Sequence, residues 1–299
     1  MLPNTIEQAQ GKWRGILAHY GLTERQLSGK HTNCPMCGGT DRFRLDDKNG
    51  TGSYICNGCG AGYGMDLLQG ITGMEFKHAA KAVDQIVGTV KAEPAKKEKS
   101  IEEIRADIKR IMAGTNRGDA MGYLASRGIT SKPDLRFHSG LEYFQDGKLT
   151  GRHPAMIGMV LDAAGKGVAI HRTYLKKGGK ADVETPRKMS AALAPLAGCA
   201  IRLYPVTGEI MGVAEGIETA CSAHDKFGIP VWSCINTTLL EQFTPPEGIK
   251  SVVIFGDHDA NFAGQRSAFA LAHRLVLKGI NVDVQIPELP GDWNDEANR

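Results

Sequence analysis

The stretch CPMCGGTDRFRLDDKNGTGSYICNGC, residues 34–59, carries two C-x-x-C pairs, Cys34 with Cys37 and Cys56 with Cys59. Eighteen residues separate the two pairs. This spacing is typical of a tetrahedral site in which four thiolates hold one zinc ion, with a hairpin between the two pairs. The sequence therefore predicts a zinc ribbon, a small β fold that the metal holds together.

Two disulfides, or a redox C-x-x-C motif, would use the same residue types. We see no secretory signal peptide, so we expect a cytoplasmic protein with reduced thiols, and a redox motif has no reason to occur twice. His31 precedes the first pair, but four cysteines already fill the zinc shell. Cys199, Cys221 and Cys234 stand in apolar surroundings and are interpreted as buried thiols. Structural zinc is the favoured interpretation.

Charge is distributed unevenly along the 299 residues, although the net charge is only +3. Residues 148–188 contain nine Lys or Arg against three Asp or Glu, whereas residues 209–299 contain six against thirteen. A basic segment beside an acidic one suits a polyanion held next to divalent metal ions. A solvated, lysine-rich hairpin is the alternative. No apolar run approaches the roughly twenty residues of a membrane span, so we expect no membrane association.

The first two thirds of the chain mix helical and strand-like patterns. Apolar spacing predicts helices over residues 5–20, 66–87 with breaks at Gly70 and Gly73, 101–112, and 119–126. Residues 91–100, which contain AEPAKKE, have no apolar face and are predicted to be a flexible linker. Strand-like stretches follow at 155–162 and 167–175, and then a basic loop at 176–188.

From residue 209 short apolar strands alternate with helices. The predicted strands are 210–214, 231–235, 252–255 and 282–286, and the predicted helices are 217–227 and 262–277. Such alternation predicts an α/β fold with a mostly parallel sheet, whose chemistry gathers at the carboxyl ends of the strands. The predicted organisation is a zinc-ribbon domain with flanking helices (1–90), a linker (91–100), a helical and basic strand region (101–208) and an α/β domain (209–299).

Acidic residues follow three of these strands. Glu215 comes directly after the first, Asp257 and Asp259 after the third, and Asp292 and Asp295 after the last. Carboxylates that converge on one edge of a sheet are the ligands that magnesium or manganese requires. Helix capping is the alternative use of such positions, as for Asp259 just before a helix. Capping does not explain five acids at three strand ends, so a metal site is favoured.

In this combination the chain resembles the bacteriophage and plasmid DNA primases, in which a zinc ribbon precedes a Toprim catalytic domain. Residues 31–60 resemble the ribbon of phage primase-helicases, and residues 167–175 resemble the segment that precedes the Toprim core. AEGIETA (214–220), GDHD (256–259) and DWND (292–295) resemble the Toprim acidic motifs.

The resemblance implies synthesis of RNA primers on a single-stranded DNA template from ribonucleoside triphosphates. It implies that Glu215 acts as general base or metal ligand, and that Asp257 and Asp259 hold magnesium. The family often has an aspartate four residues after the motif glutamate. This chain has Thr219 there and Glu218 one place earlier.

Basic residues are the candidates for contacts with triphosphate or template, because arginine forks match phosphate oxygens and lysines supply point charge. In the basic segment they are Arg152, Arg172, Lys176, Lys177, Lys180, Arg187 and Lys188. On the ribbon, Arg42 and Arg44 offer charge, and Phe43 and Tyr54 offer stacking faces for unstacked bases. Packing inside so small a fold is the alternative role of the two aromatic rings.

Two rival classes of function remain open: a Toprim metal-dependent nuclease, and a non-catalytic accessory protein that binds single-stranded DNA. A topoisomerase would need a tyrosine on a separate gate domain, for which this length leaves little room. The sequence contains no G-x-x-x-x-G-K-[ST] motif, so we expect a replicative helicase to act in trans.

Overall fold

The computed structural model describes residues 4–92, 99–117 and 120–299. The chain divides into two compact units, residues 1–98 and 99–299. The predicted linker overlaps residues 93–98, which lie outside the described residues, as does Asp119, the predicted start of a helix. The finer domain boundaries given above stay predictions.

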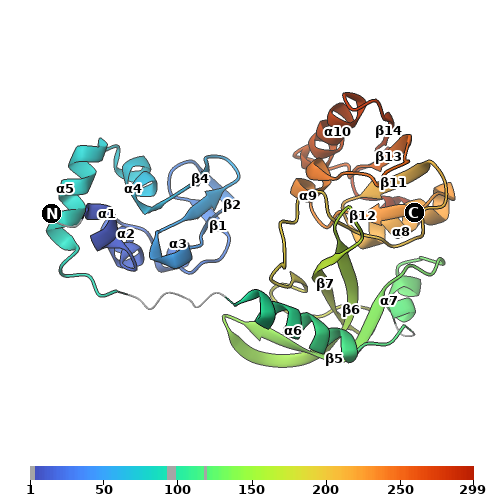
Figure 1. Ribbon diagram of the computed structural model, residues 1–299, viewed down its shortest axis with the longest axis horizontal. Coiled ribbons are helices and arrows are strands. Elements are labelled where there is room, and N and C mark those ends of the chain that lie inside the picture. Colours follow the sequence, from blue (N-terminus) through green and yellow to red (C-terminus); the bar gives the residue numbers. More distant parts are fainter. Residues whose placement is uncertain (1–3, 93–98, 118–119) are drawn as a thin grey trace. The chain divides into compact units, whose positions relative to one another are not determined.

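The first unit contains a small antiparallel sheet, as the cysteine spacing predicted (Figure 1). Its strands pair in the order β1 (Thr32–Cys34), β2 (Gly38–Leu45), β3 (Tyr54–Cys56) and β4 (Gly60–Gly62), with a 3-10 turn η1 (Lys48–Gly50) between β2 and β3. Each pair of cysteines therefore lies where one strand ends and the next begins.

Within residues 4–92, five short helices accompany this sheet: α1 (Thr5–Ala9), α2 (Trp13–His19), α3 (Glu24–Leu27), α4 (Gly64–Thr72) and α5 (Phe76–Ile86). The prediction of one helix over residues 5–20 is wrong, because Gly11 between α1 and α2 has a left-handed backbone (φ 75°). The predicted break at Gly70 is also wrong, since Gly70 lies inside α4. The break at Gly73 is confirmed, with φ 71° at the helix C-cap.

Trp13 anchors the core of the first unit with only 1% of its surface exposed. A Cβ on Gly52 would lie 2.7 Å from Cγ of Trp13, and one on Gly64 would lie 2.1 Å from Cδ2, so only glycines let the indole pack there. Phe43 and Tyr54 join the same core at 0% and 7% exposure. The interpretation of these two rings as stacking faces for bases is therefore wrong, and the packing alternative holds.

The second unit is built on one mixed sheet, ordered β14-β13-β11-β12-β10-β6-β7-β8, with β5 beside β6 and β9 beside β7. Its strands are β5 (Arg136–Gln145), β6 (Lys148–Leu161), β7 (Gly167–Lys176), β8 (Gly179–Lys180), β9 (Arg187–Met189), β10 (Ala200–Ile201), β11 (Ile210–Ala214), β12 (Val231–Ser233), β13 (Ser251–Phe255) and β14 (Asn281–Gln285). Strands β11 to β14 pair in parallel and the remaining pairs are antiparallel. The predicted α/β class with a parallel core is confirmed.

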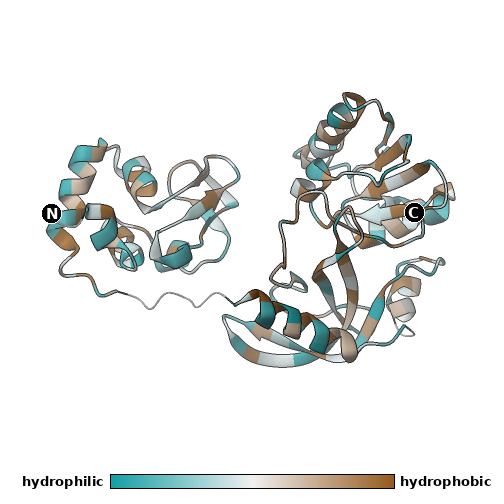
Figure 2. Cartoon of the chain, in the orientation of Figure 1, coloured by the Kyte–Doolittle hydropathy of each residue, from teal (hydrophilic) through white to brown (hydrophobic). Residues whose placement is uncertain are grey.

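Helices cover the sheet of the second unit: α6 (Ile101–Ala113), α7 (Ala120–Ser126), α8 (Ile217–Phe227), α9 (Thr237–Gln242), α10 (Ala263–Val276) and α11 (Trp293–Ala297). Helices α9 and α10 pack on one face of the parallel strands, and α8 and α11 on the other. Helix α6 packs on β5 to β7, and Figure 2 shows brown strands beneath a helix that alternates teal and brown. None of the described helices has the length and apolar character needed to cross a membrane.

Several elements differ from the sequence-based expectation. Strand β12 ends at Ser233 rather than at Ile235, and the predicted basic loop contains β8 and β9. Strand β5 and helices α9 and α11 were not predicted, because each is short or mixes polar and apolar residues without a clear period.

Candidate catalytic edge and zinc site

The four cysteine thiols of the ribbon converge on one point. The Sγ atoms of Cys34 and Cys59 are 3.8 Å apart and those of Cys37 and Cys56 are 3.7 Å apart, and all four lie within 4.8 Å of one another. Backbone N–H groups two and three residues after Cys34 and Cys56 donate to their sulfurs at 3.3 to 3.5 Å. These are the knuckles of a four-cysteine zinc site.

The two arginines expected to bind template on the ribbon have different surroundings. Arg44 is ion-paired with Asp46 at 2.5 Å and lies 3.3 Å from His31 Nε2. Arg42 is exposed, and its Nε would lie 2.2 Å from a Cβ placed on Gly39, so its guanidinium covers the first knuckle. Arg42 therefore presents its charge to solvent beside the zinc site, whereas the charge of Arg44 is already balanced.

Three strand ends meet at an acidic edge of the second unit. The carbonyl of Glu215, just after β11, accepts hydrogen bonds from Ile235 N at 2.7 Å and Ser233 Oγ at 2.8 Å, which fixes its backbone. His258 and Gly291 exchange backbone hydrogen bonds of 2.9 and 3.1 Å. This bridge brings the Asp257 to Asp259 segment beside Asp292, so residues about 35 positions apart share one edge.

Helix capping accounts for part of this acidic set. Asp259 Oδ2 accepts a hydrogen bond from Gly264 N at 2.8 Å, at the start of α10. Asp292 Oδ1 accepts from Asn294 N and Asp295 N at 2.7 and 2.9 Å, and Asp295 completes the capping box of α11. Asp257 has no such role, because its Oδ1 is buried with no hydrogen-bond partner among the described residues.

The carboxylates of this edge act on one another electrostatically. Burial, with the charge of Asp259 next in importance, raises the pKa of Glu215 to about 7. Burial, followed by Glu215, Asp292 and Asp259, likewise raises the pKa of Asp257 to about 7. Among the described residues, only the four cysteines bring three or more ligand atoms within 4.8 Å of one another, so the acids form an open rim. A buried oxygen without a hydrogen-bond partner, among carboxylates whose pKa values stay raised although Arg187 opposes the rise, fits a divalent cation.

Magnesium should stabilise this edge more at pH 8 than at pH 6. The folded pKa values of Glu215 and Asp257 exceed their unfolded values, so their contribution to stability is present below about pH 4 and is lost as pH rises through about 7. A cation binds the deprotonated carboxylates, so we expect millimolar MgCl2 to raise the melting temperature by about 5 °C at pH 8 and by about 1 °C at pH 6. Thermal unfolding in EDTA and in MgCl2, at matched ionic strength, measures both shifts. Equal shifts at the two pH values, or an undiminished shift in Asp257→Asn, would contradict the assignment.

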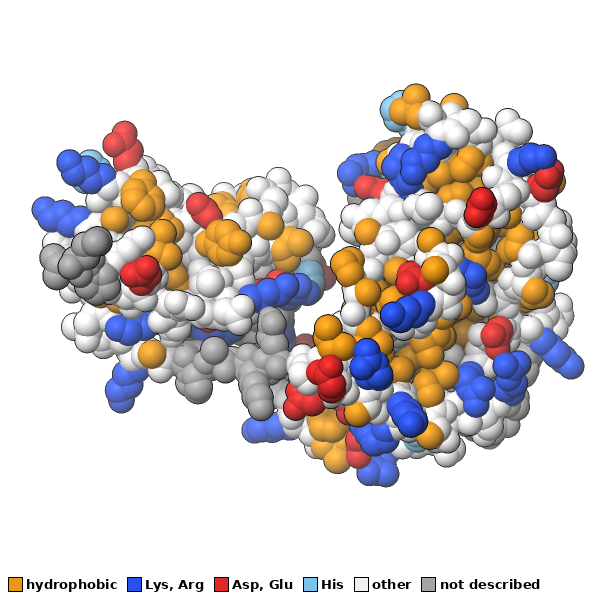
Figure 3. Space-filling model, in the orientation of Figure 1, with side chains coloured by type: hydrophobic (Ala, Val, Ile, Leu, Met, Phe, Trp, Pro, Cys, Tyr) orange, Lys and Arg blue, Asp and Glu red, His pale blue; other side chains and the backbone are white. Residues whose placement is uncertain are grey.

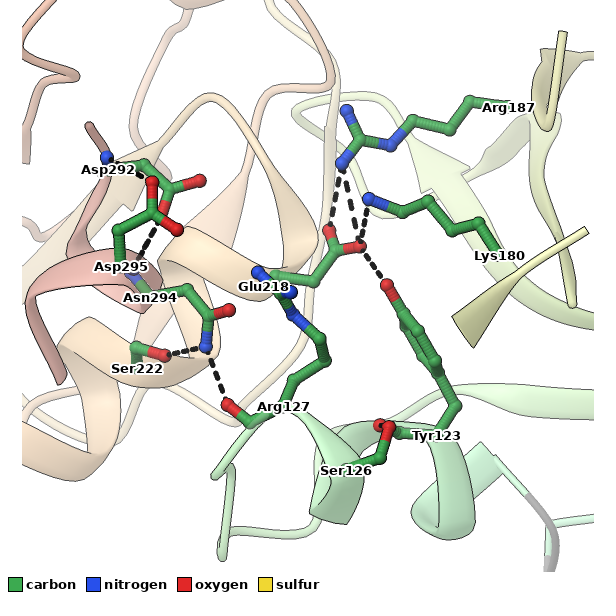
Figure 4. Close-up of polar contacts among 10 residues, drawn as sticks. All are labelled: Tyr123, Ser126, Arg127, Lys180, Arg187, Glu218, Ser222, Asp292, Asn294 and Asp295. Carbon is green, nitrogen blue, oxygen red and sulfur yellow. Dashed lines mark hydrogen bonds and ion pairs between the residues drawn. The ribbon is translucent and has the colours of Figure 1, made fainter. Parts of the chain in front are cut away.

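Glu218 lies beside this edge and joins three elements (Figure 4). Its side chain, 5% exposed on α8, accepts a hydrogen bond from Tyr123 Oη of α7 at 2.6 Å. It also pairs with Lys180 of β8 at 3.0 Å and with Arg187 of β9 at 3.5 Å. Burial alone would raise the pKa of Glu218, but Arg187, Lys180 and Tyr123 together lower it to about 2. Sequence reasoning missed Tyr123, because nothing local links it to a carboxylate 95 positions away.

The Glu218→Gln variant should be about 2 kcal/mol less stable at pH 7, because Lys180 and Arg187 lose the buried carboxylate with which they pair. The folded pKa of Glu218 is depressed below the unfolded 4.5, so its stabilisation is present above pH 4.5 and is lost as pH falls through about 2. Urea unfolding at pH 7 and pH 3 checks whether the difference from wild type narrows in acid. Glu247→Gln, at an exposed position, is the control and should change stability by under about 0.5 kcal/mol. An equally stable Glu218→Gln variant would mean that the network contributes nothing.

The basic candidates divide into separate places. Lys180 and Arg187 both pair with Glu218. The charge of Arg187 also opposes the rise in the pKa of Glu215 and Asp257, so Arg187 faces the acidic edge. Elsewhere, Lys176 is ion-paired with Asp182 at 2.5 Å. Of the remaining four, Arg152 pairs with Glu142 at 2.9 Å, Arg172 donates to Met189 O at 3.0 Å, and Lys188 Nζ lies 4.0 Å from the ring centroid of Tyr143. The fourth, Lys177, is exposed.

Comparison with family models first gives the class of the second unit. Residues 210–299 match the family model described as a Toprim domain, and residues 95–203 match a domain of unknown function, DUF7146. The parallel strands β11 to β14 and the acidic edge thus belong to a Toprim domain. Residues 29–65 match the model described as the zinc-binding domain of primase-helicase. Together the two named domains identify the chain as a DNA primase with a zinc ribbon and a Toprim catalytic domain.

Solved structures of primases are among the similar folds. The primase fragment of the bacteriophage T7 primase-helicase is 15% identical, with a TM-score of 0.39, and the match covers 89% of this chain and 92% of that one. The zinc-binding and RNA polymerase domains of the Aquifex aeolicus primase are 15% identical, with a TM-score of 0.45 and coverage of 99% and 82%. A DNA primase domain from Pseudomonas aeruginosa is 15% identical, with a TM-score of 0.43 and coverage of 65% and 73%.

Proposed function

We propose that this primase makes short RNA primers on single-stranded DNA at the acidic edge of its Toprim domain. The observation that carries the proposal is the buried, unpartnered Oδ1 of Asp257 beside Glu215, in a chain that also has a primase-type zinc ribbon. A purely structural set of carboxylates would be satisfied by hydrogen bonds, as Asp292 and Asp295 are.

In the proposed reaction the 3′-hydroxyl of one ribonucleotide attacks the α-phosphate of a ribonucleoside triphosphate, and pyrophosphate leaves. Magnesium, held by Glu215, Asp257 and Asp259 with Asp292 and Asp295 nearby, would supply the positive charge that this phosphoryl transfer needs. Acceptance of the proton of the attacking hydroxyl is the alternative role of Glu215, in which case Asp257 and Asp259 would hold the ion.

Arg187 and Lys180 are the proposed contacts for the triphosphate. The Arg187 side chain is 51% exposed, and its charge interacts electrostatically with both Glu215 and Asp257. It can therefore reach a phosphate bound at the acidic edge. Glu218 pairs with the charged ends of both side chains and so restricts their rotamers before a phosphate binds. This restriction lowers the entropy cost of binding the phosphate.

The ribbon is proposed to contact the template, with Arg42 as its available cation beside the zinc site. Arg44 contributes less, since Asp46 balances its charge. The proposal includes a replicative helicase in trans as partner and the domain boundaries predicted above.

Incubation of the full chain with single-stranded DNA, MgCl2 and labelled ribonucleoside triphosphates tests the function. We expect labelled oligoribonucleotides that require the template, the metal and the triphosphates together. Shortening of the DNA by the metal alone would favour the nuclease. Binding of DNA without either product would favour the accessory protein.

A further inference from the structure

The pairing of β9 with β7 separates the basic residues between two faces of the sheet. Arg187 pairs with Thr173, and Lys188 pairs with Arg172. Paired residues share a face and adjacent residues along a strand point to opposite faces. Arg187 therefore lies on the face of Glu218 and the acidic edge, whereas Arg172 and Lys188 lie on the opposite face, on which α6 packs.

A cavity of about 450 Å³ opens on that opposite face, between α6, β5 and β7. This volume falls in the range of small-ligand sites. Its lining combines apolar side chains from α6 and β5 with charged groups, among them Lys99, Asp107, Arg110, Glu142 and Arg172.

Positive charge is in excess around the cavity. Asp107 pairs with Lys99 and Arg110, and Glu142 pairs with Arg110 at 3.6 Å and with Arg152 at 2.9 Å. Among the described residues, two carboxylates thus pair with three cations. Lys188 donates to the carbonyl of Phe144, and Arg172 hydrogen-bonds with the carbonyl of Met189 and the side chain of Tyr174, so neither is paired with a carboxylate in this part of the chain. The Nε of Arg172 is buried and has no hydrogen-bond partner in the described part of the chain. In Figure 3, Lys and Arg side chains gather on the surface over α6 and β5.

An aromatic side chain stands at the same place. Phe144, which also lines the cavity, is 45% exposed, and its carbonyl accepts the Lys188 ammonium hydrogen bond. Cations that match phosphate, next to an exposed aromatic face, are the combination that binds unpaired nucleotides.

We propose that this cavity is a second binding site for a strand of single-stranded nucleic acid, separated from the acidic edge by the thickness of the sheet. Arg172, Lys188 and Arg110 hold phosphates of the strand, and Phe144 stacks on a base. The site concerns binding alone and does not rest on the proposed reaction. A free nucleotide offers the same phosphate chemistry, so the test has a separate arm for it.

The test measures fluorescence anisotropy of a labelled 20-nucleotide oligo(dT) with the full chain in EDTA, across a NaCl titration. The double variant Arg172→Gln/Lys188→Gln should bind the oligonucleotide about tenfold more weakly than wild type. The slope of the logarithm of the association constant against the logarithm of the NaCl concentration should fall in magnitude by about 1.4, which is about 0.7 for each lost phosphate contact. Arg266→Gln/Lys250→Gln removes the same charges from ion pairs with Glu241 and Glu209 and is the matched control, with no change expected.

Phe144→Ala should also weaken binding about tenfold, but without changing the salt slope, because stacking releases no counterions. A labelled ribonucleoside triphosphate should bind the double variant as it binds wild type. If the double variant does not fold, Arg110→Gln replaces it, since that side chain is 60% exposed, with an expected slope change of about 0.7. Unchanged affinity and slope for the oligonucleotide would overturn the proposal. So would loss of triphosphate binding with oligonucleotide binding intact, which would assign the cavity to a free nucleotide.

Discussion

Replacing Asp257 by asparagine should lower primer synthesis by about 10³-fold or more. The carboxylate sits buried after β13 with one oxygen unpartnered, among three other acids. Asparagine keeps the size of the side chain but removes the charge that balances a divalent cation. A barrier rise of about 4 kcal/mol is the scale for losing such charge stabilisation in the transition state.

The rate of labelled oligoribonucleotide formation at saturating template and triphosphate measures this loss. Asp283→Asn, at an exposed position on β14, removes the same charge from the same sheet and should leave the rate unchanged. Binding of single-stranded DNA in EDTA should be equal in the two variants. A rate within tenfold of wild type in Asp257→Asn would remove this residue from the catalytic set.

Replacing Cys56 by serine should remove zinc and unfold the ribbon while the second unit stays folded. Structural zinc contributes about 10–16 kcal/mol in small zinc domains, which is more than such a fold can lose. Cys34 and Cys56 are themselves part of the core that contains Trp13 and Phe43, so the metal and the packing fail together. The cores of the second unit contain none of these residues.

Zinc content by elemental analysis, and limited proteolysis read by mass spectrometry, check this result. Cleavage within residues 29–65 should become fast, while fragments that begin near residue 99 persist. Cys221→Ala, which removes a thiol from the core of the second unit, should keep its zinc. A zinc-replete, protease-resistant Cys56→Ser protein would show that three thiols suffice.

Local patterns in the sequence predicted the parts of this structure that depend on local physics. The ribbon followed from Cys34 to Cys59, because metal geometry restricts the spacing of its ligands. The alternation after residue 209 predicted the parallel strands, since each buried strand and amphipathic helix has its own period. The acids after these strands were predicted to share an edge, and the bridge between His258 and Gly291 shows how the last two segments meet.

Contacts that depend on strand register or on distant partners could not be predicted. Lys180 and Arg187 could be recognised as basic, but their partner Glu218 is 38 and 31 positions away. No pattern in the sequence indicates that Arg187 and Lys188, adjacent in the chain, serve opposite faces of the sheet. That division depends on the pairing of β9 with β7, which only the folded chain defines.

The short strand β10 has a mechanical consequence. It pairs with β6 on one side and with β12 on the other, so one continuous hydrogen-bonded sheet crosses from the DUF7146 match into the Toprim match. Those two matches are therefore regions of one folding unit. A fragment of residues 209–299 would lack β10 and would leave β12 as an unpaired edge strand. Through this shared sheet, backbone hydrogen bonds connect the basic strands to the strands that carry the acidic edge.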